Sequence, residues 1–185
     1  MSTLTVVFVI AGQGYQPFEY HIPKRVLQNA GIKVITASNS STGTATASDG
    51  SSDTVDIQLK DITTKYDGLY LVGGPGALEN LDTPTMHTII QQFAQENKPF
   101  GAICISPRIL AHAGVLNDKK ATGWDNDKEL AGIFKEHHVT YVHKSVVTDG
   151  SVITATGPSA AEDYGKAIAR LLLKKEHKHG HCSCK

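Results

Sequence analysis

The run Leu4-Thr5-Val6-Val7-Phe8-Val9-Ile10-Ala11 is almost continuously apolar and rich in β-branched residues. Such a run is typical of a strand that is buried on both faces of a parallel sheet. Apolar residues then recur at helical spacing between Phe18 and Leu27, and Gly31 follows as a helix stop signal. The N-terminal segment therefore predicts a strand, a helix and a second strand over residues 32–37.

The same alternation continues along the chain. Apolar runs predict strands at residues 69–72 and 100–104, and a hairpin within 145–155 around Asp149-Gly150. The polar stretch 38–53 predicts a loop or small hairpin. Helical spacing predicts helices at 86–93, 109–115 and 130–134, and a last helix from Ser159, with Glu162 completing a capping box. We expect one α/β domain, a mainly parallel sheet with helices on both faces.

The size and charge of the chain limit the classes of function that the sequence supports. The chain has 185 residues, enough for one sizeable core, and its 18 basic residues balance 18 acidic ones. A neutral chain gives no electrostatic reason to expect nucleic acid or an anionic membrane as a partner. No apolar run reaches the roughly 18 residues needed to span a bilayer. With no signal peptide pattern at the start and no disulfide framework among three cysteines, we expect a cytoplasmic protein.

Cys104 ends the expected strand 100–104, and a helix should begin about two residues later, with Ser106 as its N-cap and Pro107 in its first turn. The small residues Gly101 and Ala102 allow a sharp strand-to-helix turn of the nucleophile-elbow kind. A helix N-terminus favours thiolate over thiol, so we expect a Cys104 pKa well below that of a free cysteine. The alternative is a buried structural cysteine.

Two other loops should lie at the same edge of the sheet. Glu19 opens the first helix beside its buried face, where desolvation would raise its pKa and let it hold a proton for a thiolate. The alternative is a solvated glutamate that complements the helix dipole. Gly73-Gly74-Pro75-Gly76 matches no phosphate-binding motif, so its N–H groups predict either an oxyanion hole or a tight structural turn.

Taken together, these loops resemble the ThiJ/PfpI superfamily, which includes the parkinsonism-associated deglycase and the PfpI-type intracellular peptidases. The resemblance covers residues 4 to about 173, and four motifs carry it: Pro17-Phe18-Glu19 followed by Ile22-Pro23, the run 67–76, Ala102-Ile103-Cys104 with Pro107, and Gly157-Pro158. It implies a flavodoxin-like three-layer sandwich, usually a homodimer. It also implies Cys104 as nucleophile or oxidisable thiol, Glu19 as its protonated partner, and the N–H groups of Gly74 and Ile105 as oxyanion donors.

The chain departs from the family pattern at two histidines. The peptidases carry histidine directly after the nucleophile, where this chain has Ile105, and the deglycase branch carries one near the position of Trp124. His21 and His112 are candidates to replace them, although each is more commonly a surface or packing histidine. A Cys–His pair of the usual kind is therefore not expected.

The last residues concentrate soft and borderline metal ligands, His177, His179, His181, Cys182 and Cys184. This composition suits Zn, Ni or Cu, and the alternative is a disordered polar terminus that holds no metal. We therefore expect an α/β domain over residues 1–176 and a mobile His/Cys-rich tail over residues 177–185.

The sequence favours a protein that uses Cys104 on small reactive carbonyl compounds, as a glyoxalase or deglycase does, with no required cofactor. One alternative is an intracellular cysteine peptidase or amidase. Another is a non-catalytic redox sensor or chaperone that responds to oxidation of Cys104. The missing histidine disfavours the peptidase, because a departing amine needs an acid to protonate it.

Overall fold

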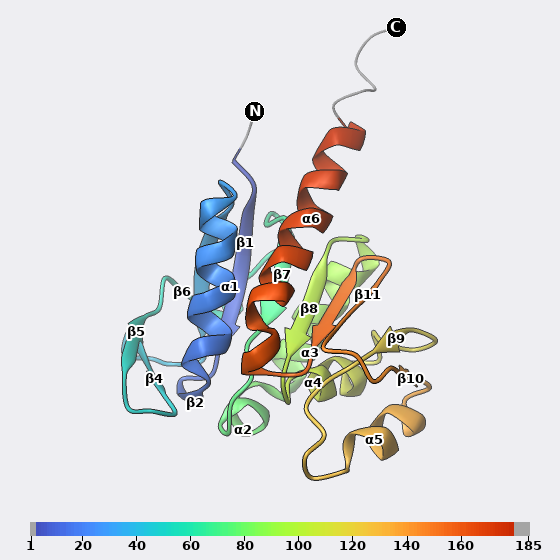
Figure 1. Cartoon of the computed structure of the whole chain (residues 1–185). Helices are drawn as coiled ribbons and strands as arrows, with labels where there is room; N and C mark the ends of the chain where they lie inside the picture. Colours follow the sequence, from blue (N-terminus) through green and yellow to red (C-terminus); the bar gives the residue numbers. More distant parts are fainter. Residues whose placement is uncertain (1–2, 180–185) are drawn as a thin grey trace, which may run out of the picture.

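The computed structural model describes residues 3–179 and is built around a seven-stranded sheet (Figure 1). Its strand order is β11-β12-β8-β7-β1-β3-β6. The strands span β1 (Thr5–Ile10), β3 (Lys33–Ser38), β6 (Ile57–Gln58), β7 (Gly68–Leu71), β8 (Phe100–Ile103), β11 (Val146–Asp149) and β12 (Val152–Ala155). Every neighbouring pair is parallel except β11 and β12, which form the expected hairpin. The predicted mainly parallel sheet is confirmed.

Helices cover both faces of this sheet, as expected. α1 (Pro17–Asn29) and α6 (Ala161–His179) lie side by side on one face, while α3 (Pro84–Gln95) and α4 (Pro107–His112) lie on the other (Figure 1). The apolar run that opens the chain becomes β1, and residues 6–11 are completely buried between the two helical layers. Burial on both faces explains why this strand needs apolar residues at every position rather than at alternate ones.

The remaining elements are short. They are β2 (Gln13–Tyr15), β4 (Thr44–Ala47), β5 (Ser52–Thr54), η1 (Leu59–Asp61), α2 (Ala77–Leu81), β9 (Lys120–Ala121), α5 (Leu130–Glu136), β10 (Thr140–Tyr141) and η2 (Pro158–Ala160). β4 and β5 pair antiparallel, which confirms the small-hairpin alternative for the polar stretch 38–53. The carboxyl ends of a parallel sheet are where ligands commonly bind.

The last helix begins later than predicted. α6 begins at Ala161 after the 3-10 turn η2, so Ser159 lies inside that turn rather than at the helix cap. The proline at the first position of the turn fixes its backbone φ there and starts the turn one residue before Ser159. At the other end α6 continues to His179, past the expected domain boundary at residue 176.

Close packing of α6 on α1 brings both helix starts to one place. A Cβ atom added at Gly165 would lie 2.8 Å from Pro23 Cα, a distance that real Cβ contacts do not reach. Glycine at this position therefore lets the two helices approach closely, and Gln16 and Glu19 at the start of α1 line one pocket together with Pro158. Within residues 3–179, no helix is long and apolar enough to cross a membrane.

Candidate active site

Cys104 lies in a sharp turn directly after β8, in a strained backbone conformation. Its φ is 64°, in the left-handed region that non-glycine residues rarely adopt. Such a residue costs on the order of 1–3 kcal/mol and persists only where its surroundings hold it. Here its N–H donates to Ala155 O (2.9 Å) and its carbonyl accepts from Trp124 N (2.7 Å). The expected nucleophile-elbow geometry is confirmed, and the thiol is half-buried rather than sealed in the core.

Ser106 stands at the predicted N-cap position, directly before Pro107 at the start of α4, but its side chain does not cap the helix. Ser106 has a helical backbone (φ −68°, ψ −18°) and its side chain makes no capping hydrogen bond. Its hydroxyl donates instead to Val72 O (2.8 Å), which ties the cysteine turn to the segment after β7. The following helix α4 has only six residues. Ser106 therefore links the turn after β8 to the segment after β7. A contact between segments this far apart in the chain cannot be predicted from a local sequence pattern.

Glu19 is completely buried and lies beside the cysteine. Its Oε2 accepts from Gly73 N (3.1 Å), and its carboxyl group is hydrogen-bonded to Cys104. A Cβ atom at Gly73 would lie 2.5 Å from Cys104 Cβ and 2.6 Å from Glu19 Oε2. Glycine at the end of β7 therefore permits the approach of these two side chains. Within the described structure, Glu19 Oε1 has no hydrogen-bond partner.

The two groups control each other's protonation. Burial raises the pKa of Glu19 to about 7, against the opposing hydrogen bonds from Cys104 and Gly73. Burial and the neighbouring Glu19 carboxylate raise the pKa of the Cys104 thiol to about 12, although the backbone N–H groups of Ile105 and Gly74 lower it. The expectation of an acidic thiol is therefore wrong while Glu19 is ionised, because burial and a like charge outweigh the N–H donors.

These N–H groups point at the sulfur itself. The backbone of Gly74 and of Ile105 donates hydrogen bonds to the Cys104 side chain. The family resemblance implied both as donors to a substrate oxyanion, and in the structure both N–H groups lie beside the Cys104 side chain. Donors in this position stabilise a thiolate when the proton of the pair resides on Glu19.

A pocket of about 350 Å³ opens over the sulfur. Its lining residues come from the carboxyl edge of the sheet and the loops above it: Gln16, Glu19, Gly74, Pro75, Cys104, Ile105, Trp124 and Pro158. All four residues that the sequence singled out, Cys104, Glu19, Gly74 and Ile105, therefore meet in one cavity. Three of the others, Gln16, Pro75 and Pro158, were not predicted as site residues, although Pro75 and Pro158 stand in quoted motifs and Gln16 directly precedes one.

The sequence matches a known protein family over nearly its whole length. The family model described as "DJ-1/PfpI family" matches residues 5–171. The chain belongs to the DJ-1/PfpI family. It is 32% identical over 176 residues to an uncharacterized protein of Methanocaldococcus jannaschii, a match covering 94% of this chain and 85% of that one. An uncharacterized protein of Staphylococcus aureus is 28% identical over 172 residues, covering 90% and 97%.

Solved structures of the family have the same fold. The ThiJ/PfpI domain protein from Brachyspira murdochii superposes with a TM-score of 0.87 at 24% identity, covering 94% of this chain and 99% of that one. DJ-1beta of Drosophila melanogaster superposes with a TM-score of 0.82 at 27% identity, covering 95% and 93%. The flavodoxin-like sandwich expected from the sequence resemblance is thereby confirmed.

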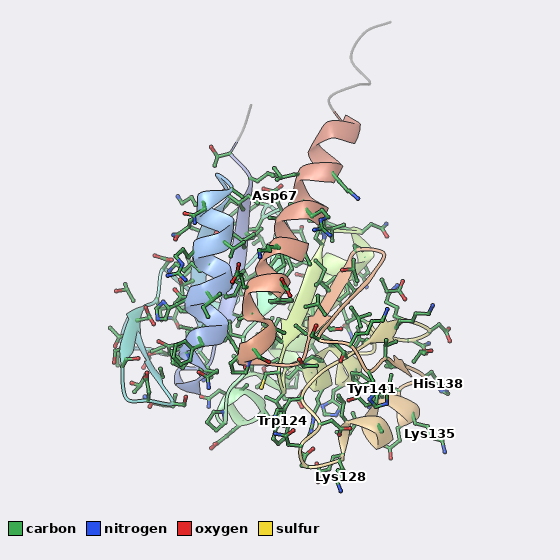
Figure 2. All side chains as sticks on the ribbon, in the orientation of Figure 1. Asp67, Trp124, Lys128, Lys135, His138 and Tyr141 are labelled. Atoms are coloured by element: carbon green, nitrogen blue, oxygen red, sulfur yellow. The ribbon has the colours of Figure 1, made fainter. Side chains whose placement is uncertain are left out.

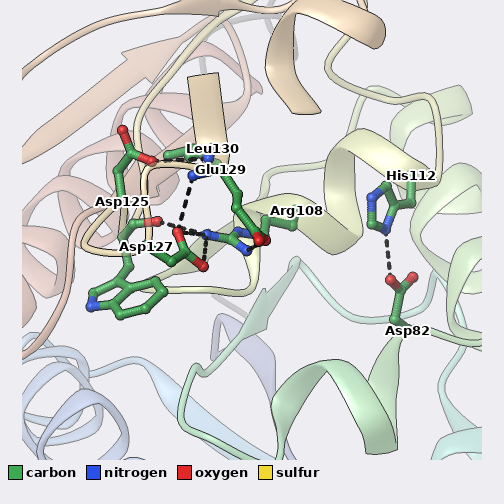
Figure 3. Close-up of polar contacts among 8 residues, drawn as sticks. Asp82, Arg108, His112, Asp125, Asp127, Glu129 and Leu130 are labelled. Atoms are coloured by element: carbon green, nitrogen blue, oxygen red, sulfur yellow. Dashed lines mark hydrogen bonds and ion pairs between the residues drawn. The ribbon is translucent and has the colours of Figure 1, made fainter. Parts of the chain in front are cut away.

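Neither candidate histidine lines the pocket of this DJ-1/PfpI protein. His112 Nδ1 pairs with Asp82 Oδ2 at 2.6 Å, on the far side of α4 from the Asp125–Leu130 loop (Figure 3). His21 Nε2 pairs with Asp53 Oδ2 at 3.0 Å. Both histidines have acidic partners of their own, so neither replaces the histidines that the sequence lacks at Ile105 and Trp124.

Arg108 is a buried cation that sequence reasoning missed. It is 3% exposed, and its Nη2 contacts both carboxylate oxygens of Asp127 at 2.7 and 2.8 Å (Figure 3). Its Nη1 lies 3.3 Å from Glu129 Oε2. The available signal was an arginine between Pro107 and the buried Ile109, followed by an acidic cluster about twenty residues later.

The structure describes only part of the predicted metal-ligand cluster at the C-terminus. His181, Cys182 and Cys184 fall outside the described residues, and the backbone of His177 and His179 belongs to α6. In the part of the chain that is described, no cluster of three or more histidine, cysteine or acidic side chains is arranged to hold a metal ion. Metal binding by the C-terminal residues stays a prediction.

Proposed function

We propose that this DJ-1/PfpI protein is a cysteine-dependent enzyme that converts small dicarbonyl compounds, such as methylglyoxal, to 2-hydroxy acids. The observation that carries the proposal is the pairing of a strained, half-buried Cys104 with a fully buried Glu19 in one pocket. A nucleophile next to a carboxyl group with a pKa near 7 provides both the attacking group and the proton carrier.

The first step needs the proton on Glu19. Above about pH 7 the pair holds one proton, and the reactive form is the thiolate with the protonated carboxyl group. Cys104 Sγ attacks the aldehyde carbon and a C–S bond forms. The electron pair of the C=O bond moves to oxygen, which takes the proton from Glu19 to give a hemithioacetal. The N–H groups of Gly74 and Ile105 stabilise the thiolate before attack.

The following steps use the same carboxylate. Glu19 removes the proton from the former aldehyde carbon and delivers it to the neighbouring carbon, while the enediol O–H proton passes to the adjacent oxygen. The product is a 2-hydroxyacyl thioester of Cys104. Water then cleaves the C–S bond, releasing the 2-hydroxy acid and restoring the pair with one proton. The overall change is methylglyoxal plus water to lactic acid, so no external oxidant or reductant is needed.

Amide hydrolysis is less well supported by this site. The departing amine must receive a proton from an acid, and no histidine lines the pocket among the described residues. Trp124 provides only a weakly acidic indole N–H. We therefore expect no appreciable peptidase activity.

The test is a substrate panel of methylglyoxal, glyoxal and short peptide amides. We expect dicarbonyl turnover that Cys104→Ser abolishes and that Glu19→Gln lowers by on the order of a hundredfold, the usual contribution of a positioned acid–base group. His112→Gln, outside the pocket, is the matched control and should keep full activity. Cys104-dependent cleavage of the peptides would instead establish the hydrolase. Failure to turn over any compound, together with ready conversion of Cys104 to sulfinic acid by peroxide, would favour the redox sensor.

A further inference from the structure

Apart from Gln16, Glu19 and the thiol, the side chains that line the pocket are apolar, and among the described residues no cation lines it. The apolar side chains are those of Pro75, Ile105, Trp124 and Pro158. An anionic substrate would lose its hydration here without gaining a positive partner, and it would face the acidic Glu19. An apolar or aromatic group would gain from burial against these apolar side chains.

Trp124 is the largest of these side chains, and the backbone holds it close to the nucleophile. Its N–H donates to Cys104 O at 2.7 Å. A Cβ atom at the preceding Gly123 would lie 3.1 Å from the same carbonyl oxygen, so a small residue there lets the loop pack on the cysteine turn. Figure 2 shows Trp124 at the end of the molecule that carries α2 and the loop before α5.

Arg108, which does not line the pocket, contacts this tryptophan. The guanidinium carbon lies 5.6 Å from the centroid of the indole ring, within the range of a cation–π contact. Nη2 also donates to Trp124 O at 3.4 Å. Because Asp127 and Glu129 pair with the guanidinium, its charge is neutralised within the loop and is not offered to the pocket (Figure 3).

Further hydrogen bonds make the loop around Trp124 rigid. Asp125 Oδ1 accepts from Leu130 N at 2.9 Å, and Asp127 Oδ1 accepts from Glu129 N at 3.2 Å (Figure 3). The Asp125 carboxylate also bonds the Tyr141 side chain. An aromatic wall held in this way is preorganised, so a bound group need not order it.

We propose that Trp124 determines the selectivity of the Cys104 pocket for dicarbonyl compounds with an apolar or aromatic substituent over anionic ones, and that Arg108 is its positioning residue. The substrate class in this proposal rests on the function proposed above. The selectivity of the pocket toward reagents that alkylate Cys104 is independent of that function.

The first experiment measures alkylation of Cys104 in the whole chain by three reagents of one reactive type: N-phenyliodoacetamide, iodoacetamide and iodoacetate. Mass spectrometry resolves the rate at Cys104, and each rate is divided by that of the same reagent with N-acetylcysteine. We expect the phenyl-to-carboxylate ratio at Cys104 to exceed that of the free thiol by about tenfold or more, the scale of discrimination by apolar pockets. A ratio equal to that of the free thiol would overturn the proposal.

Substitutions at Trp124 and Arg108 test whether these residues cause the phenyl-to-carboxylate preference. Trp124→Ala should remove most of the preference, whereas Trp124→Phe should retain it. Arg108→Met should lower the ratio as Trp124→Ala does, and Arg108→Lys should recover part of it because it keeps the positive charge beside the ring. Val152→Ala, a buried site on β12, controls for loss of stability and should leave the ratio unchanged. An unchanged ratio in Trp124→Ala would overturn the assignment.

The second experiment compares kcat/KM for phenylglyoxal and 4,5-dioxopentanoate, a dicarbonyl compound whose substituent carries a carboxylate. We expect phenylglyoxal to be favoured by at least about tenfold in the wild type, and Trp124→Ala to reduce this mainly through KM for phenylglyoxal. Turnover without a preference would refute the selectivity while leaving the enzyme function intact. The alkylation preference without any turnover would refute the enzyme function and leave the selectivity standing.

Discussion

At the scale of single residues, the site holds two groups in states that oppose folding. Cys104 has a left-handed backbone, and Glu19 is an acid with no exposed surface, one oxygen of which has no hydrogen-bond partner among the described residues. Both features destabilise the native state, and both are typical of residues at functional sites. This trade-off between stability and reactivity can be measured.

Replacing Glu19 by glutamine should stabilise the protein at neutral and alkaline pH. The folded-state pKa of about 7 exceeds the ordinary value of 4.5, so the folded protein binds more protons between these values and loses stability as the pH rises through them. At about 1.4 kcal/mol per pKa unit, the unfolding free energy of the wild type should fall by roughly 3 kcal/mol as the pH rises through this interval. The Glu19→Gln variant should not show this loss. Urea unfolding at pH 4.5 and pH 8 measures the difference.

The matched control for this measurement is Glu162→Gln. Glu162 is an exposed carboxylate whose pKa Lys166 lowers, so its replacement should not bring a gain in stability as the pH rises. Equal unfolding free energies of the wild type and Glu19→Gln at both pH values would contradict the raised pKa.

Alkylation of Cys104 by iodoacetamide should show two rises with pH. Below about pH 7 both members of the pair are protonated and the thiol is unreactive. Loss of the first proton creates the thiolate form shared with Glu19, and loss of the second, near pH 12, adds a further rise. In Glu19→Leu the first rise should disappear, because burial alone then governs the thiol. A single rise at high pH in the wild type would show that the shared proton stays on sulfur.

At the scale of elements, the end of β7 controls the distance between the two reactive groups. Alanine at Gly73 would place its Cβ against Cys104 and Glu19, so Gly73→Ala should destabilise the fold by about 1–3 kcal/mol and separate the pair. Denaturant unfolding and the pH profile of alkylation report the two effects. Gly132→Ala in α5 is the control. A Cβ atom at Gly132 would have no neighbour within 4 Å, so this substitution should stabilise the fold by up to about 1 kcal/mol.

At the scale of the whole molecule, we expect a homodimer, as the family resemblance implies. The chain has no net charge at neutral pH, so electrostatic self-repulsion does not oppose association. Light scattering at micromolar concentration should give twice the 19.8 kDa of one chain. A mass of one chain across that range would contradict this expectation.

Local patterns in the sequence were sufficient for the architecture. The continuous apolar run at residues 4–11 implied a strand buried on both sides, and the alternation that followed implied a parallel sheet between helices. Because parallel strands end at one edge, Cys104 after β8 and Glu19 after β1 could be expected to meet. These inferences hold because periodicity and turn residues act over a few neighbouring positions.

Tertiary structure alone decided the electrostatics of the site. The high pKa of the thiol arises from burial and from Glu19, and the contact depends on Gly73, thirty-one residues before Cys104. The role of Ser106, the burial of Arg108 and the separate partners of His21 and His112 likewise depend on segments distant in the chain. Desolvation and charge pairing are set by which remote atoms fill the space around a group, and no local spacing encodes that.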